Sequence, residues 1–250
     1  MTAASAATPA FSRSWRWPTQ RRSAATLLAG AVLVWLVVCG LGWLLAHPLT
    51  DHGFTRWEGG VDRFLAAHRS GGWNSVTNAA SLAGDTPAAI GMSVLAFIVL
   101  RLSVHRWREP LMLAVAMLGE VAIFSSSTVV VGRHRPDVAH LDGSPPTSSF
   151  PSGHTAASTT LYGVLAIVAL CYASRVLWRV LSVAAAVVIV LSIGTSRLYR
   201  GMHYPTDVAG GILLGLLWIT VVSLVILRHH TPRSRDAAGD ESRRAEAGRR

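Results

Sequence analysis

Three short motifs in this 250-residue chain carry most of the side chains that could do chemistry. They are Arg135-Pro136, Pro151-Ser152-Gly153-His154, and Ser196-Arg197 followed by His203 and Asp207. Arginine binds phosphate oxygens in a bidentate manner, and histidine can act as a nucleophile or as a proton donor. Together these residue types predict a site that binds a phosphate group and cleaves its ester or anhydride bond.

The second motif directly precedes an apolar run and therefore predicts the start of a helix. Ser152 fits the N-cap position, with Gly153 and His154 in the first turn. A helix N-terminus favours an anion, glycine allows close approach of a phosphate, and histidine can protonate a departing oxygen. The alternative interpretation is a capped helix without a ligand, and the tetrapeptide by itself favours that alternative.

The third motif places a histidine and a carboxylate at the start of the last apolar run. Pro205 fits the first helical position, which leaves His203 just before the helix and Asp207 in its first turn. The carboxylate could accept the imidazole N–H and leave the other ring nitrogen free as a nucleophile. An acidic residue there is equally well explained by the helix dipole.

Two arginines of the motifs border apolar segments. An unpaired guanidinium is costly there, so an arginine in such a position usually marks a bound anion or another partner. This applies to Arg135 and Arg197. Such groups would stabilise the negative charge of a phosphoryl transition state. Arg133 and Arg200 lie close by, and a solvated loop charge is the simpler interpretation of both.

The composition indicates that these motifs sit in a membrane protein. Hydrophobic residues make up 51% of the chain, charged residues 14%, and the mean hydropathy is +0.40. The formal charge of +10 comes from arginines, with no lysine, in the tails and short loops, which indicates membrane topology rather than nucleic-acid binding. We therefore expect an all-α, polytopic bundle of six transmembrane helices in contact with the lipid bilayer. The apolar runs extend over about 24–46, 82–104, 110–131, 154–173, 177–196 and 207–227.

The arginines also predict the orientation and the domain organisation. We expect a disordered cytoplasmic N-tail (1–22), a six-helix membrane domain (23–228) and a basic cytoplasmic C-tail (229–250). By parity, all three motifs then share the extracytoplasmic face of the cell membrane. Residues 47–81 lie on the same side and could form short helices at the membrane interface.

The ordered motifs resemble the type 2 phosphatidic acid phosphatase superfamily. These are integral membrane phosphatases with six helices, and the vanadium haloperoxidases share their site. The motifs cover residues 128–207, and the pattern of apolar runs extends the resemblance over most of the chain.

The resemblance implies a role for each motif residue. It implies that His203 is the nucleophile and forms a phosphohistidine, that Asp207 orients it, and that His154 is the general acid. It further implies a phosphate-binding set made up of Arg135, Arg197, Ser152 and Gly153. No metal and no cofactor take part in that scheme.

One position departs from the family pattern. The first motif of the family begins with a lysine seven residues before the arginine, and here that position is Thr128. A neutral hydroxyl donor is weaker than a charge-assisted one, so Thr128 is a weak phosphate ligand, and one positive charge is missing unless Arg133 or Arg200 supplies it. We expect the activity to be retained, with a lower rate or an altered substrate preference.

The leading hypothesis is a lipid phosphatase that acts at the outer leaflet on a polyprenyl diphosphate or phosphate, or on a phosphatidate-type lipid. The alternative is a lipid-phosphate binder or transporter that uses the same anion pocket without turnover. A vanadate-dependent peroxidase and an intramembrane serine protease fit less well, because six spans argue against the first and no triad supports the second. The sequence leaves the oligomeric state open.

Two further acidic residues lie in or near the apolar runs. Asp85, within Gly84-Asp85-Thr86-Pro87, is predicted to cap a helix start. Glu120 is predicted to pair with an arginine inside the bundle. We expect neither to be catalytic.

Overall fold

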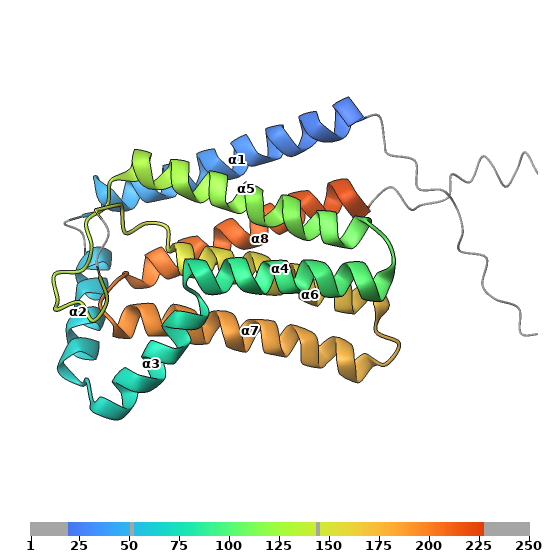
Figure 1. Ribbon diagram of the computed structural model, residues 1–250. Coiled ribbons are helices and arrows are strands. Elements are labelled where there is room, and N and C mark those ends of the chain that lie inside the picture. Colours follow the sequence, from blue (N-terminus) through green and yellow to red (C-terminus); the bar gives the residue numbers. More distant parts are fainter. Residues whose placement is uncertain (1–19, 51–52, 144–145, 228–250) are drawn as a thin grey trace, which may run out of the picture.

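The computed structural model describes residues 20–50, 53–143 and 146–227. Within these ranges the chain forms α-helices and no strand, which confirms the predicted all-α class (Figure 1). The helices are α1 (Gln20–Ala46), α2 (Gly53–Ala67), α3 (Gly71–Ala83), α4 (Thr86–Val104), α5 (Arg108–Val131), α6 (Gly153–Tyr172), α7 (Val176–Tyr199) and α8 (Pro205–Leu227).

The expected tails lie largely outside the described residues. This applies to all of 229–250 and to most of 1–22. Helix α1 begins at Gln20, before the expected end of the N-tail.

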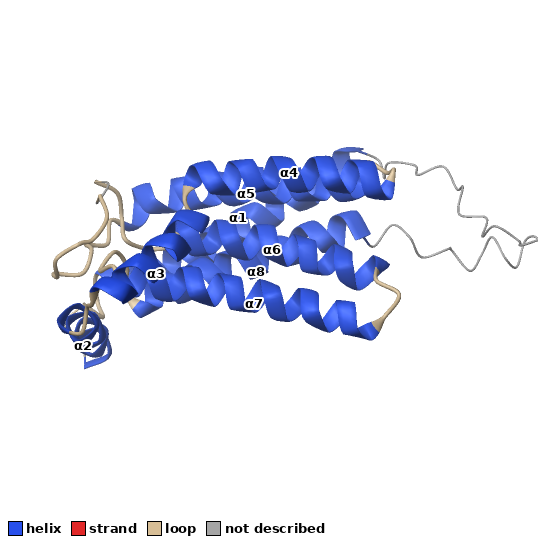
Figure 2. Cartoon of the chain, turned by 60° about the horizontal axis from the view of Figure 1, so that its bottom comes forward, coloured by secondary structure: helices blue, strands red, loops and turns tan. Residues whose placement is uncertain are grey.

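Six of the described helices, α1 and α4 to α8, are long and apolar enough to cross a membrane. They lie side by side along one direction, while α2 and α3 gather at one end (Figures 1 and 2). The prediction of six spans is therefore confirmed. Two boundaries differ from the hydropathy pattern: α4 begins at Thr86 rather than near Leu82, which belongs to α3, and α7 continues to Tyr199.

Helix α6 is the centre of the bundle and packs against α4, α5, α7 and α8. Its contact with α8 is close because α8 presents glycines to it. A Cβ atom on Gly211 would lie 2.5 Å from the carbonyl oxygen of Ser152, and one on Gly215 would lie 2.7 Å from the side chain of Thr159. Small residues allow such close approach of membrane helices. This approach lets the Ser152 N–H donate to the carbonyl oxygen of Asp207 at 2.9 Å.

The apolar core joins α1, α5, α6 and α8. It contains Val38, Met112, Leu161 and Leu214, all buried. Glu120 is buried in the same region of α5, and no ion pair to it occurs within the described ranges, so the predicted arginine partner is absent from this part of the chain.

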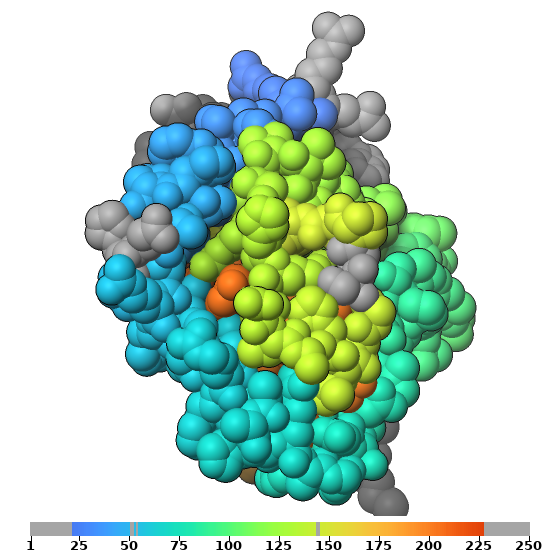
Figure 3. Space-filling view, turned by 90° about the vertical axis from the view of Figure 1, so that its left-hand side faces the viewer, coloured from blue at the N-terminus to red at the C-terminus, as the bar shows by residue number. Residues whose placement is uncertain are grey.

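Residues 47–81 do form short helices, α2 and α3, as the sequence suggested. Helix α2 lies across the end of the bundle, and with α3 and the segment after α5 it covers most of that end face (Figure 3). The cover is tied down by hydrogen bonds to the end of α7. The Ser70 N–H donates to the Tyr199 hydroxyl at 2.9 Å, and Arg69 donates to the carbonyl oxygens of Ala139 and Tyr199.

We expect Gly211→Ala to lower stability by about 1–3 kcal/mol, because its methyl group would meet the backbone of α6 rather than a movable side chain. The measurement is thermal unfolding in detergent. Gly40→Ala on α1 is the matched control, since a Cβ there has no neighbour within 4 Å. Equal melting temperatures for the two variants would contradict this account of the contact between α6 and α8.

Candidate active site

The three motifs come together at the end of the bundle that α2 and α3 cover. The loop after α5 supplies Arg135, the start of α6 supplies His154, and the end of α7 supplies Arg197. His203 lies in the turn before α8. One bond between the motifs is the donation from Arg135 Nη1 to the carbonyl oxygen of Met202 at 2.8 Å.

His203 is held with one ring nitrogen free. It is 5% exposed, and its Nδ1 atom donates to the carbonyl oxygen of Ser149 at 2.7 Å. The Asp207 Oδ2 atom lies 3.8 Å from Nδ1, too far for a hydrogen bond, so the expected direct bond to the carboxylate is replaced by one to the backbone. With the proton on Nδ1, the lone pair is on Nε2, which makes no hydrogen bond to a described residue.

The surroundings of His203 favour the neutral ring. Burial lowers the pKa of His203; Asp207 opposes this effect, while the charges of Arg197 and Arg135 add to it. A neutral imidazole with a free Nε2 atom is the form that can attack phosphorus.

The carboxylate of Asp207 is fixed by Arg133. The Arg133 Nη1 atom donates to Asp207 Oδ1 at 2.5 Å, and its Nη2 atom donates to Glu58 Oε2 at 2.6 Å. Burial alone would lower the pKa of Arg133, but the carboxylates of Asp207 and Glu58 outweigh it, so the guanidinium stays charged. The structure therefore buries Arg133 on carboxylates. The simpler interpretation of Arg133 and Arg200 as solvated loop charges is wrong, since they are 7% and 5% exposed, and both arms of the Arg133 guanidinium are bonded to carboxylates rather than available to a phosphate.

The two arginines of the motifs each keep a buried donor without a partner, although Arg197 also donates through Nη1 to Asp142 at 2.7 Å and to Ser81 at 2.5 Å. The Nε atoms of Arg135 and Arg197 are buried and have no hydrogen-bond partner among the described residues. Burial lowers the pKa of Arg135, and the nearby charge of Arg197 lowers it further. Unpaired buried N–H groups on two neighbouring cations are costly, and an anion placed between them would satisfy both.

His154 has a carboxylate partner that the sequence interpretation missed. Its Nε2 atom donates to Asp85 Oδ1 at 2.5 Å. Asp85 does occupy the N-cap position of α4, but its side chain makes no capping bond. The adjacent glycine makes room for the ring, because a Cβ on Gly84 would lie 3.3 Å from the Cδ2 atom of His154. The sequence predicted Asp85 only as a helix cap, because its partner His154 lies on another helix, 69 residues away.

The remaining motif residues are used within the fold. Ser152 is at the N-cap position of α6 as predicted, but its hydroxyl accepts a bond from Thr155 and does not cap the helix. A Cβ on Gly153 would lie 2.6 Å from the Phe124 ring, so packing alone requires glycine there. The Thr128 hydroxyl donates to the Ser125 carbonyl of its own helix at 2.8 Å.

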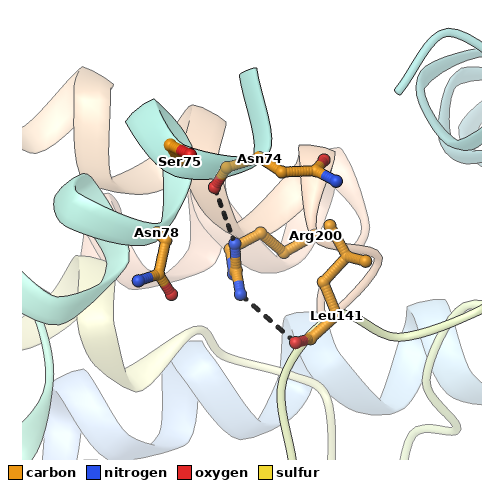
Figure 4. A pocket seen from close by; sticks show the side chains of 5 residues that line it. All are labelled: Asn74, Ser75, Asn78, Leu141 and Arg200. Carbon is orange, nitrogen blue, oxygen red and sulfur yellow. Dashed lines mark hydrogen bonds between the residues drawn. The ribbon is translucent and has the colours of Figure 1, made fainter. Parts of the chain in front are cut away.

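Arg200 is a structural link and does not replace the missing lysine. It donates to Asp142 through Nε and Nη2. It also donates to the carbonyl oxygens of Leu141 and Asn74 (Figure 4). Burial raises the pKa of Asp142, but bonds from Arg200 and the charge of Arg197 outweigh it and lower that pKa. A polar hollow of about 270 Å³ lies beside this link, lined by Asn74, Ser75, Asn78, Leu141 and Arg200.

Comparison with known proteins confirms the resemblance seen in the motifs. Residues 109–230 match the PAP2 superfamily. Phosphatidylglycerophosphatase B of Bacillus subtilis is 39% identical over 95 residues, which is 37% of this chain and 45% of the relative. Lipid A 1-phosphatase of Rhizobium johnstonii is 32% identical over 105 residues, 38% of each chain. Decaprenylphosphoryl-5-phosphoribose phosphatase of Mycobacterium tuberculosis is 31% identical over 129 residues, 50% of this chain and 66% of the relative.

The matched segments thus span between 38% and 66% of the length of these relatives. A solved structure extends the likeness to most of the fold. The crystal structure of a transmembrane PAP2-type phosphatidylglycerolphosphate phosphatase from Bacillus subtilis has a TM-score of 0.67 at 22% identity, covering 79% of this chain and 94% of that one. The arrangement of helices is therefore that of a transmembrane PAP2 protein.

The buried carboxyl group of Asp62, at the same end of the bundle as the site, should make the stability of the protein depend on pH. It is 1% exposed, and neither carboxylate oxygen has a hydrogen-bond partner among the described residues. Burial and the charges of Asp207 and Glu58 raise its pKa from 3.8 to about 7. Between about pH 4 and pH 7 the folded protein keeps a proton that the unfolded chain has lost, so stability falls as the pH rises through this window.

We therefore expect Asp62→Asn to raise the melting temperature in detergent at pH 8 and to flatten the decline between pH 4 and pH 7. The measurement is a series of thermal unfolding curves across that range for both proteins. Parallel curves for the two proteins would show that Asp62 is ionised at low pH and would overturn the assignment.

Proposed function

We propose that this chain, whose residues 109–230 form a PAP2 superfamily domain, hydrolyses lipid phosphates or diphosphates through a phosphohistidine on His203, without a metal ion. The observation that carries the proposal is the free Nε2 atom of His203 near two guanidinium groups with unpartnered buried N–H donors. The names of the relatives support the reaction class, since all three are phosphatases of lipid-linked substrates.

The reaction follows from the placement of four side chains. Arg135 and Arg197 bind the phosphate oxygens and stabilise the charge of the transition state. The Nε2 lone pair of His203 forms a bond to phosphorus as the bond from phosphorus to the leaving oxygen breaks. His154 gives its proton to that oxygen, and Asp85 stabilises the imidazolium form of His154 before the transfer.

The second step restores the enzyme. A water molecule attacks the phosphorus of the phosphohistidine, and the neutral His154 accepts a proton from it. The bond from phosphorus to Nε2 breaks, inorganic phosphate leaves, and His203 returns to its neutral form.

The substrate class follows from the position of the site. The reacting groups lie at the ends of membrane-spanning helices, at the level where lipid headgroups meet the protein. The end face is covered by α2, α3 and the segment after α5, which favours a substrate that enters from the lipid (Figure 3). We propose a polyprenyl phosphate or diphosphate, or a phosphatidate-type lipid.

We place the site on the extracytoplasmic side of the cell membrane and the two termini in the cytoplasm. The α4–α5 and α6–α7 connections lie at the opposite end and, together with the first turns of α5 and α7, carry Arg106, Arg108, Arg175 and Arg179. Excess arginine in short loops marks the cytoplasmic side. Arg133 and Arg200 at the site end are instead paired with carboxylates.

A second candidate function is binding or transport of a lipid phosphate without hydrolysis. Its support is Thr128, which stands where the family has lysine and whose hydroxyl is used inside α5. Release of inorganic phosphate from a lipid phosphate distinguishes hydrolysis from binding or transport.

We expect the purified protein to release inorganic phosphate from polyprenyl diphosphate or from phosphatidate in the presence of EDTA. His203→Ala should lower kcat by at least about 1,000-fold, because no other group supplies the nucleophile. Alkaline quenching during turnover should trap an acid-labile phosphohistidine at position 203. His105→Asn, at the opposite end of the bundle, is the control. An absolute requirement for a divalent metal, or normal turnover by His203→Ala, would refute the mechanism.

We expect Asp85→Asn to lower kcat about 10- to 100-fold on alkyl phosphates, since His154 loses the charge that stabilises its proton. An aryl phosphate substrate, whose leaving group needs no proton, should show a much smaller loss. Asp137→Asn, an exposed loop carboxylate, is the control. Equal losses on alkyl and aryl substrates would show that Asp85 does not act through proton donation.

A further inference from the structure

We propose that Glu58, on α2, is a positioning residue for this site: it holds Arg133, Arg133 holds Asp207, and Asp207 faces His203. The inference rests on the proposed function and adds a residue outside the three motifs and outside the matched residues 109–230.

The contacts form one buried chain from α2 to the reacting histidine. Glu58 and Asp207 are 0% exposed and Arg133 is 7% exposed. Each arm of the guanidinium bonds to one carboxylate, at 2.6 Å to Glu58 Oε2 and at 2.5 Å to Asp207 Oδ1. With both arms taken up, the plane of the guanidinium is fixed by groups from α2 and α8.

Two further contacts hold Arg133 in this orientation. Its Nη1 atom also donates to the Thr206 hydroxyl at 2.8 Å, and its guanidinium lies 4.4 Å from the centroid of the Tyr204 ring. The α2 carboxylate is still needed, because without it the Nη2 donors would be buried without an acceptor. Arg133 would then gain freedom to move, and the carboxylate of Asp207 would move with it.

The other oxygen of Asp207 shows what this positioning achieves. Asp207 Oδ2 accepts the backbone N–H of Tyr204 at 2.8 Å and lies 3.8 Å from His203 Nδ1. The carboxylate is therefore held from both sides, by Arg133 on Oδ1 and by the backbone on Oδ2. Its charge opposes the loss of a proton from Nδ1 and stabilises the ring as it gains a positive charge on phosphorylation.

We expect the charge of Glu58 to act on His203 indirectly, through Arg133 and Asp207. His203 is faced by Asp207, Arg197 and Arg135. The groups around Arg133 are the two carboxylates that it bonds, with Asp62 beside them on α2. Without the negative charge of Glu58, the positive charge of Arg133 is less well neutralised. We therefore expect the pKa of His203 to fall further in a variant that lacks this charge.

Glu58→Gln is the variant that tests the proposal. Glutamine keeps the shape and one oxygen acceptor, so the fold is retained. The bond to Arg133 is no longer charge-assisted, however, and it holds the guanidinium less firmly. We expect kcat to fall about 10-fold with KM changed less than about twofold, because the phosphate and the lipid are bound elsewhere. The acid limb of the profile of kcat/KM against pH should move to lower pH.

A double-mutant cycle separates positioning through Arg133 from other effects. If Glu58 acts through Arg133, Glu58→Gln should have no further effect in an Arg133→Gln background. Asp62→Asn is the matched control, since Asp62 is buried on the same face of α2 but makes no hydrogen bond to Arg133. We expect its kcat to stay within about twofold of the wild type. A Glu58→Gln loss that persists in full in the Arg133→Gln background would overturn the proposal.

One readout does not depend on turnover. Diethyl pyrocarbonate modifies neutral imidazoles, and peptide mass spectrometry gives the rate at His203 as a function of pH. In Glu58→Gln the midpoint of this reaction should move to lower pH. In Asp62→Asn the midpoint should stay close to that of the wild type, because the pKa of Asp62 is raised to about 7 and its carboxyl is largely neutral where His203 titrates. No phosphate release by the wild type would refute the proposed function, whereas an unchanged His203 midpoint in Glu58→Gln would refute the role of Glu58.

Discussion

The buried ion pair between Arg133 and Asp207 connects the parts of the chain on which the site depends. Arg133 comes from the segment after α5, and Asp207 from the first turn of α8. Glu58 brings α2 into the same cluster. A buried charge is tolerated only with a partner, so the three segments must meet at this point for any of their charges to be buried. The position of His203 follows, because it lies in the turn that these contacts hold.

The same requirement divides the arginines into two kinds. Arg133 and Arg200 are bonded to carboxylates through their guanidinium groups. Arg135 and Arg197 each retain a buried Nε–H without a partner among the described residues, although Arg197 also pairs with Asp142 through Nη1. Sequence position does not reveal this division, because Arg133 and Arg135 are two residues apart in one motif. The division becomes apparent only from the bonding partners, which are distant in the sequence. Glu58 lies 75 residues from Arg133, and Asp142 lies 58 residues from Arg200.

Hydropathy and motif order were sufficient to predict the six spans and to bring His154, Arg197 and His203 to one end, because burial in lipid imposes a strong pattern on the sequence. The contribution of residues 47–81 could not be predicted. Glu58 and Asp62 lie four residues apart on a helix that also carries the exposed Phe64, a pattern typical of a helix with a solvated acidic face. Asp85 likewise matched a helix cap. Glu58 pairs with Arg133, 75 residues away, and Asp85 with His154, 69 residues away, and a single sequence does not reveal such pairings.

Thr128 removes one positive charge from the family pattern, and no described arginine takes its place, since Arg133 and Arg200 are paired. In the proposed mechanism, Arg135 and Arg197 supply the charge on the phosphate, together with the N-terminus of α6. Burial lowers the pKa of Arg135 and the charge of Arg197 lowers it further, and an anion between the two guanidinium groups would offset this repulsion. The fold maintains this repulsion through α2, α3 and the close contact between α6 and α8. The site is thus held ready for a charge that the substrate brings, which is the arrangement that stabilises a phosphoryl transition state most effectively.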